Sequence, residues 1–173
     1  MSASPEFPEP HPNLVESWEA FLERCDPDEF PPLQWVLNAH LITENGIEQI
    51  LSLLLPKSDE LSRFSYSQKV NVLAAFKLID PSRIAGLRSF NSLRNNFAHK
   101  LDFEPTMADV EKVGAHFPKI WKKVNDKAVT ECPMGRLFPI IGLICGDLCR
   151  IRLEILECQE GEQDSARQST TQV

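Results

Sequence analysis

Residues 80–100, DPSRIAGLRSFNSLRNNFAHK, form the stretch that decides how this 173-residue chain folds. An Asp followed directly by a Pro is a strong helix start, because Asp80 can cap the first turn and Pro81 suits the first helical position. Apolar residues then recur at three- and four-residue steps, at Ile84, Leu87, Phe90, Leu93 and Phe97. This spacing predicts an amphipathic helix that packs against other helices.

The rest of the chain repeats this pattern, with polar or proline-containing breaks between helical segments. Helical spacing of apolar residues predicts further helices at 13–25, 33–55, 67–79, 110–124 and 134–156. Pro118 would kink or break the fourth of these, and Gly46 would let another helix approach the second closely. Glycine is scarce at 7 residues against 13 prolines, and no alternating strand pattern is found. We predict an all-α bundle of about five or six helices.

We expect one folded domain at 13–158 between two tails without regular structure. Residues 1–12 are rich in proline, and residues 159–173 have almost no apolar side chains. We expect no membrane interaction, because no run of about 18 apolar residues is present. The five cysteines are odd in number and follow no export signal, so we expect reduced thiols and a cytoplasmic protein.

The net charge of -7 argues against a surface that binds nucleic acid nonspecifically, although one small basic cleft remains compatible with it. The only concentrated basic residues are Lys119, Lys122, Lys123 and Lys127. A lysine cluster on a helix is usually a solvated face, so direct DNA binding ranks lowest. No carboxylate cluster and no CxxC pattern with paired histidines is present, and we expect neither a metal nor a cofactor.

Residues 93–100, LRNNFAHK, carry the groups best suited to chemistry. Arg94 offers a planar fork of donors to a phosphate, His99 can move a proton, and Asn95 can orient either group. In an unbroken helix Arg94 and His99 point about 140° apart, so they share a ligand only if the helix opens near His99 or two chains combine. The alternative is structural: Arg94 pairs with a buried carboxylate such as Glu44, and His99 caps the helix.

Three short segments resemble a known family. Residues 41–44 (LITE), 68–73 (QKVNVL) and 93–99 (LRNNFAH) are similar to those of HEPN-type domains (higher eukaryotes and prokaryotes nucleotide-binding), and in particular to small bacterial proteins grouped with the mannitol operon repressor. HEPN ribonucleases carry an Arg, often followed by Asn, and then a His after four to six residues. The resemblance covers residues 41–105.

The resemblance implies an HEPN-like, all-α up-and-down bundle that forms a homodimer, in which two such helices meet at a composite cleft. It also implies a metal-independent endoribonuclease that leaves 2′,3′-cyclic phosphate ends. By position, Arg94 would bind the scissile phosphate, His99 would be the general acid or base, and Asn95 would position them. Glu44 would support Arg94, and Lys69 would contact the RNA backbone. The setting would be a toxin–antitoxin or defence system with an antitoxin or other protein partner. The alternative is a non-catalytic regulatory or protein-interaction module of the mannitol operon repressor-like type.

Overall fold

The predicted all-α fold is confirmed in a computed structural model, which describes residues 23, 25, 28–55, 58–126 and 133–170, apart from the side chains of 58–59 and 162–170. The elements are α2 (Pro32–Leu54), the 3-10 helix η1 (Ser58–Arg63), α3 (Tyr66–Ala75), α4 (Pro81–His99), α5 (Met107–Gly114), α6 (Pro118–Asp126) and α7 (Pro133–Thr170). These ranges contain no strand. The predicted tail at 1–12 and helix at 13–25 fall almost wholly outside the described residues.

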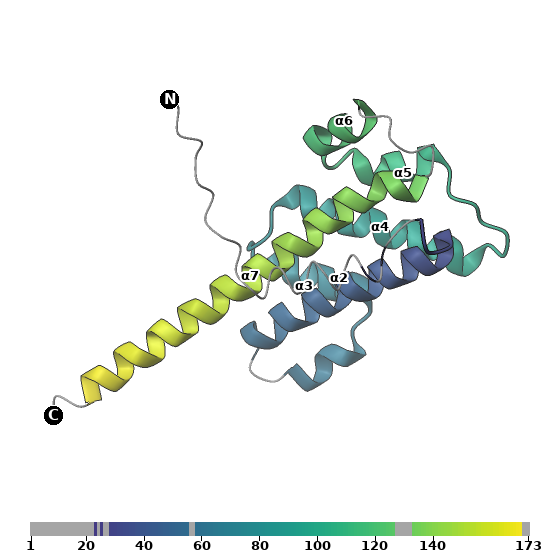
Figure 1. Cartoon of the computed structure of the whole chain (residues 1–173). Helices are drawn as coiled ribbons and strands as arrows, with labels where there is room; N and C mark the ends of the chain where they lie inside the picture. Colours follow the sequence, from purple (N-terminus) through teal and green to yellow (C-terminus); the bar gives the residue numbers. More distant parts are fainter. Residues whose placement is uncertain (1–22, 24, 26–27, 56–57, 127–132, 171–173) are drawn as a thin grey trace, which may run out of the picture.

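The longest helices, α2 and α7, pack along each other and form the spine of the bundle (Figure 1). Two contacts show that they run in the same direction. Gly46 faces Leu148, and further along both helices the Gln159 side chain donates to the carbonyl of Leu53 at 3.1 Å. A Cβ atom added at Gly46 would lie 3.2 Å from Leu148 Cδ1. The glycine thus permits the close approach of a second helix that the sequence predicts.

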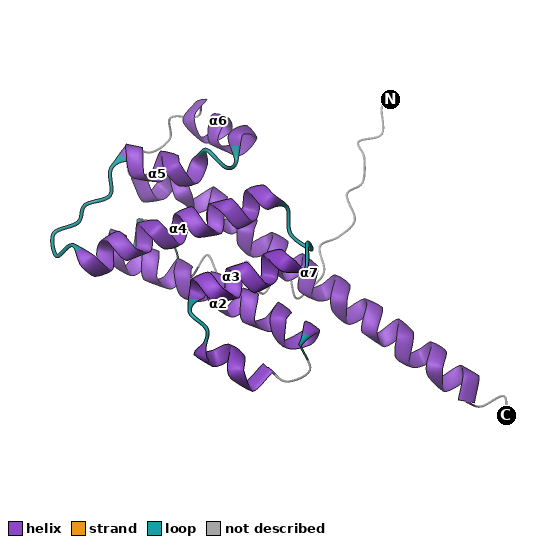
Figure 2. Cartoon of the chain, turned by 180° about the vertical axis from the view of Figure 1, so that it is seen from behind, coloured by secondary structure: helices purple, strands orange, loops and turns teal. Residues whose placement is uncertain are grey.

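Helix α4 forms as its sequence predicts. The Asp80 carboxylate accepts from the Ser82 backbone N–H at 2.8 Å, and Pro81 occupies the first turn. The apolar face is buried at Ile84, Leu87, Phe90 and Leu93. Seen from behind, α4 lies between α3 and α5 (Figure 2), and the Arg83 side chain joins it to Asp147 of α7 at 2.8 Å. The helix that carries the candidate motif is therefore held on three sides.

Two boundaries differ from the sequence prediction, each for a local reason, and a third agrees with it. Helix α3 ends at Ala75, because Lys77 adopts a φ of 57° that no right-handed helix accommodates. Of the kink or break predicted at Pro118, the structure shows the break: α5 ends at Gly114 and α6 begins at Pro118, which lacks the N–H that would continue α5. Helix α7 continues through Thr170, although residues 159–170 were expected to be unstructured. That stretch contains no proline and extends a helix already nucleated by packing.

Four of the five cysteines lie in the part of the chain that the structure describes. Cys25 and Cys149 are buried, Cys145 is half-buried and Cys158 is exposed, and none of the four forms a disulfide. Burial raises the pKa of the Cys145 thiol, so that it stays protonated. Cys132 lies outside the described residues. No helix in the described ranges is long and apolar enough to cross a membrane.

Two glycines give a matched test of the packing. Gly86→Ala would place its Cβ 2.4 Å from Cε2 of the Phe117 ring, whereas Gly146→Ala meets no atom within 4 Å. We expect Gly86→Ala to lower the free energy of unfolding by about 1–3 kcal/mol through overpacking. Gly146→Ala should raise it by up to about 1 kcal/mol through helix propensity. Urea denaturation checks both, and equal effects at the two positions would contradict the packing of α4 on Phe117.

Candidate functional site

Arg94 and His99 occupy different faces of one continuous helix. α4 stays regular through His99, and the Lys100 backbone N–H still donates to the Asn96 carbonyl four residues back, at 3.0 Å. The two side chains therefore project about 140° apart. His99 is exposed at the end of the helix, whereas Arg94 is partly buried. Within one chain, the helix does not open to bring them onto one ligand.

The Arg94 guanidinium has little to hold it within the described part of the chain. Its Nε atom is buried and has no hydrogen-bond partner there. Nη1 donates one long hydrogen bond, 3.5 Å, to the Asn95 side-chain oxygen. No carboxylate of the described residues forms an ion pair with it. A buried donor without a partner is rare in folded proteins and costs roughly 1–3 kcal/mol. Arg94 is thus available to an anion that the described part of the chain does not supply.

Glu44 pairs with Lys69 and not with Arg94, the partner that the sequence suggested. Its Oε1 accepts from Lys69 Nζ at 2.5 Å, and Glu48 accepts from the same ammonium. Lys69 is only 3% exposed, so its ammonium does not lie on the surface of α3. A buried ammonium needs charged partners, and the two glutamates provide them. We therefore do not place Lys69 among groups that contact RNA.

His40 links this ion cluster to α4, and it was not among the site residues predicted from the sequence. Its Nε2 lies 3.0 Å from the Asn91 side-chain oxygen, and its Nδ1 lies 3.9 Å from Glu44 Oε2. The imidazole stacks on the Tyr66 ring with centroids 4.1 Å apart. The four-residue step from His40 to Glu44 on one helix face was visible in the sequence. Asn91 could not be recognised, because only the packing of α4 on α2 brings it to His40.

The pKa of His40 depends on its burial and on the charged side chains around it. Burial lowers the pKa of His40, and the positive charges of Arg94 and Lys69 lower it further. The hydrogen bond to Asn91 and the negative charge of Glu44 oppose that shift without cancelling it. Burial by itself would also lower the pKa of Lys69, but Glu44 and Glu48 more than offset it and raise that pKa. The cluster therefore consists of a neutral imidazole beside a charged ammonium–glutamate group and the Arg94 guanidinium.

Comparison with known proteins gave no match to any protein family, any curated protein or any solved structure. The functional argument thus depends on the residues themselves and on their arrangement.

The lowered pKa of His40 predicts a defined pH dependence of stability. Between its folded-state pKa and the ordinary value of 6.5, the unfolded chain binds more protons than the folded chain. The free energy of unfolding should therefore fall as the pH drops below 6.5, by at most about 1.4 kcal/mol per pH unit from this group. Urea denaturation at pH 5.5–7.5 measures the slope. His40→Gln should flatten it, and His99→Gln, at an exposed position, should leave it unchanged. An unaltered slope in His40→Gln would refute this account.

Proposed function

We propose that this chain is a HEPN-like, metal-independent endoribonuclease of the cytoplasm, acting as a homodimer with Arg94 and His99 as its catalytic residues. The observation that carries the proposal is the arrangement of these residues on α4. Arg94 keeps an unpartnered buried donor, and His99 is exposed on another face of the same unbroken helix. Among the residues that the structure describes, neither side chain has the partners that a purely structural role would give it. An incomplete half-site on each chain is the arrangement that a dimeric enzyme of this kind requires.

An exposed apolar surface supports the pairing of two chains. Leu33, Leu37 and Leu41 follow one another at four-residue steps on α2, and Leu41 is 61% exposed. Leu101, directly after α4, is 99% exposed. The start of α2 and the end of α4 lie at the same end of the molecule (Figure 1). Isolated exposed leucines need no explanation, but a series of them beside a half-site favours an interface between two copies.

The proposed reaction needs only the groups that two such half-sites would supply. The 2′-hydroxyl oxygen attacks the adjacent phosphorus, the P–O5′ bond breaks, and a 2′,3′-cyclic phosphate and a 5′-hydroxyl result. His99 would remove the 2′-hydroxyl proton or protonate the departing O5′, a role typically worth 10²–10⁴-fold in rate. Arg94 would stabilise the phosphate as its charge redistributes. Asn95, which accepts from Arg94 Nη1, would hold the guanidinium in place.

The two catalytic residues can be tested together by mixing inactive chains. His99→Ala and Arg94→Ala should each abolish RNA cleavage, measured in EDTA with a labelled single-stranded RNA. If each site takes Arg94 from one chain and His99 from its partner, a 1:1 mixture should recover about a quarter of the wild-type activity. Half of the dimers are then mixed, and each mixed dimer has one intact site of two. Cleavage by His99→Ala at the wild-type rate would end the catalytic role of His99.

Stability measurements separate this proposal from its rival, a regulatory or protein-interaction module. The acidic net charge and the exposed leucines also suit a protein partner such as an antitoxin. In that case the motif would stabilise the bundle, and Arg94→Ala would lower the free energy of unfolding by several kcal/mol. A catalytic Arg94 predicts an unchanged or higher stability, because the substitution removes an unsatisfied buried donor.

The exposed leucines of α2, Leu33, Leu37 and Leu41, give an independent test of the dimer. Leu37→Glu would bury two like charges in a symmetric interface, one from each chain, and should raise the dimer dissociation constant at least about a hundredfold. Leu78→Glu is the matched control, because Leu78 is exposed to a similar degree but follows α3. Sedimentation equilibrium measures both. A dimer that tolerates Leu37→Glu would place the interface elsewhere on the chain.

A further inference from the structure

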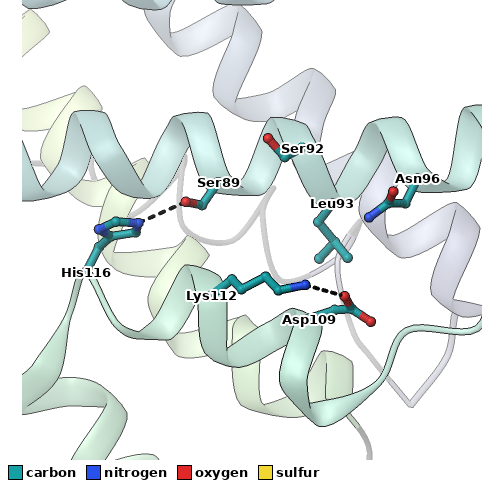
Figure 3. Close-up of a pocket in the computed structure, with 7 residues that line it drawn as sticks. All are labelled: Ser89, Ser92, Leu93, Asn96, Asp109, Lys112 and His116. Carbon is teal, nitrogen blue, oxygen red and sulfur yellow. Dashed lines mark hydrogen bonds and ion pairs between the residues drawn. The ribbon is translucent and has the colours of Figure 1, made fainter.

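A cavity of about 440 Å³ lies between α4 and α5 (Figure 3). Ser89, Ser92, Leu93 and Asn96 line it from α4. Across from them lie Asp109 and Lys112 of α5, followed by His116. Volumes of roughly 300–1,000 Å³ are typical of sites for small organic ligands. The ribonuclease mechanism proposed above uses none of these side chains.

The polar groups gather at the two ends of the cavity. At one end, Ser89 and His116 are joined by a hydrogen bond of 2.8 Å between the hydroxyl oxygen and Nε2. At the other end, Asn96 lies opposite Asp109, as Figure 3 shows. Ser89 and Asn96 are seven residues apart on α4, which is roughly 10 Å along the helix axis. The cavity is therefore long enough for a planar heterocycle with an attached sugar.

The side chains that line the cavity favour an uncharged ligand with hydrogen-bonding groups along its edge over a bare phosphate. Lys112 Nζ lies 3.0 Å from Asp109 Oδ1, so the cavity's main cation is already neutralised by its main anion. The Asn96 amide offers both donors and an acceptor, the Asp109 carboxylate accepts, and Leu93 supplies an apolar contact. A nucleobase presents the complementary set: an apolar face and an edge with donors and acceptors.

The position of the cavity on α4 connects it to His99. Ser92 and His99 are seven residues apart and point within about 20° of each other, and Asn96 precedes His99 by less than one turn. The cavity thus adjoins the face of α4 that presents His99, while Arg94 points away from it. An RNA strand whose scissile bond lay at His99 would bring a neighbouring base to the Asn96 end.

We infer that the α4–α5 cavity binds one unstacked nucleobase of single-stranded RNA, next to the bond at which His99 acts. The inference rests on the proposed ribonuclease function for its substrate and makes the cavity the source of base preference. Asn96 and Asp109 would contact the edge of the base. The Ser89–His116 end would receive its ribose.

The experiment measures base preference with and without the Asn96 amide. The His99→Ala protein, which should bind RNA without cleaving it, is titrated with fluorescent five-nucleotide oligo(A), oligo(C), oligo(G) and oligo(U). Addition of Asn96→Leu should weaken binding of the preferred oligonucleotide about tenfold and reduce the differences among the four. Lys112→Met removes the ion pair that holds the Asp109 carboxylate, so this second variant should weaken binding in the same direction. Asn125→Leu, at an exposed position on α6, is the matched control and should leave all four affinities unchanged.

Separate outcomes distinguish the cavity from the ribonuclease proposal. If the wild-type chain cleaves RNA while Asn96→Leu and Lys112→Met keep its affinities and base preference, the cavity inference is overturned and the enzyme stands. If the chain cleaves no RNA, nuclear magnetic resonance titration with the four nucleoside 5′-monophosphates decides. Shifts at Ser89, Asn96 and His116 that Asn96→Leu removes would keep the cavity as a nucleobase site without the ribonuclease. The absence of such shifts would overturn it.

Discussion

The contact on which the central part of this bundle depends is the buried ammonium of Lys69, held between Glu44 and Glu48. It joins α3 to α2 at a place where every other arrangement would leave a charge without a counterion. His40 extends the cluster to α4 through Asn91, and Tyr66 covers the imidazole from α3. Because burial makes unpaired polar groups costly, these side chains fix the relative position of three helices more narrowly than apolar packing can.

The second constraint is the continuity of α4. A capped and proline-initiated start, a buried apolar face and regular hydrogen bonding through Lys100 leave no freedom for the motif to rearrange within one chain. Arg94 is turned toward the polar cluster, and His99 toward solvent. This division accounts for an arginine with an unsatisfied buried donor in an otherwise well-paired region. It also explains why the proposed site needs a second chain: the helix that provides both residues keeps them apart.

Some residues of the candidate site stabilise the bundle, and others are free to contact a ligand. The Lys69 cluster contributes to the bundle, and its ammonium is already paired with two carboxylates. Arg94 and His99 project from different faces of one rigid helix, and the α4–α5 cavity adjoins the face of His99. In the proposed dimer, a ligand would meet Arg94 of one chain and His99 of the other, beside a polar recess, and each helix would hold its own group in a fixed geometry. Groups held in this way need no reorganisation on binding, which favours the function proposed for them.

The sequence by itself determined the helices, because the signals for them are local. The Asp80–Pro81 start, the three- and four-residue spacing of apolar side chains and the proline breaks each act within a few residues. It also singled out Arg94, Asn95 and His99 and the angle between them, since helix geometry is independent of tertiary context. Only the tertiary structure decided which charges meet. It paired Glu44 with Lys69 instead of Arg94, brought Asn91 to His40, and opened the cavity between α4 and α5. The partners in those contacts lie far apart in the sequence, on different helices. Whether they meet depends on how the helices are rotated against one another, and no local pattern encodes that rotation.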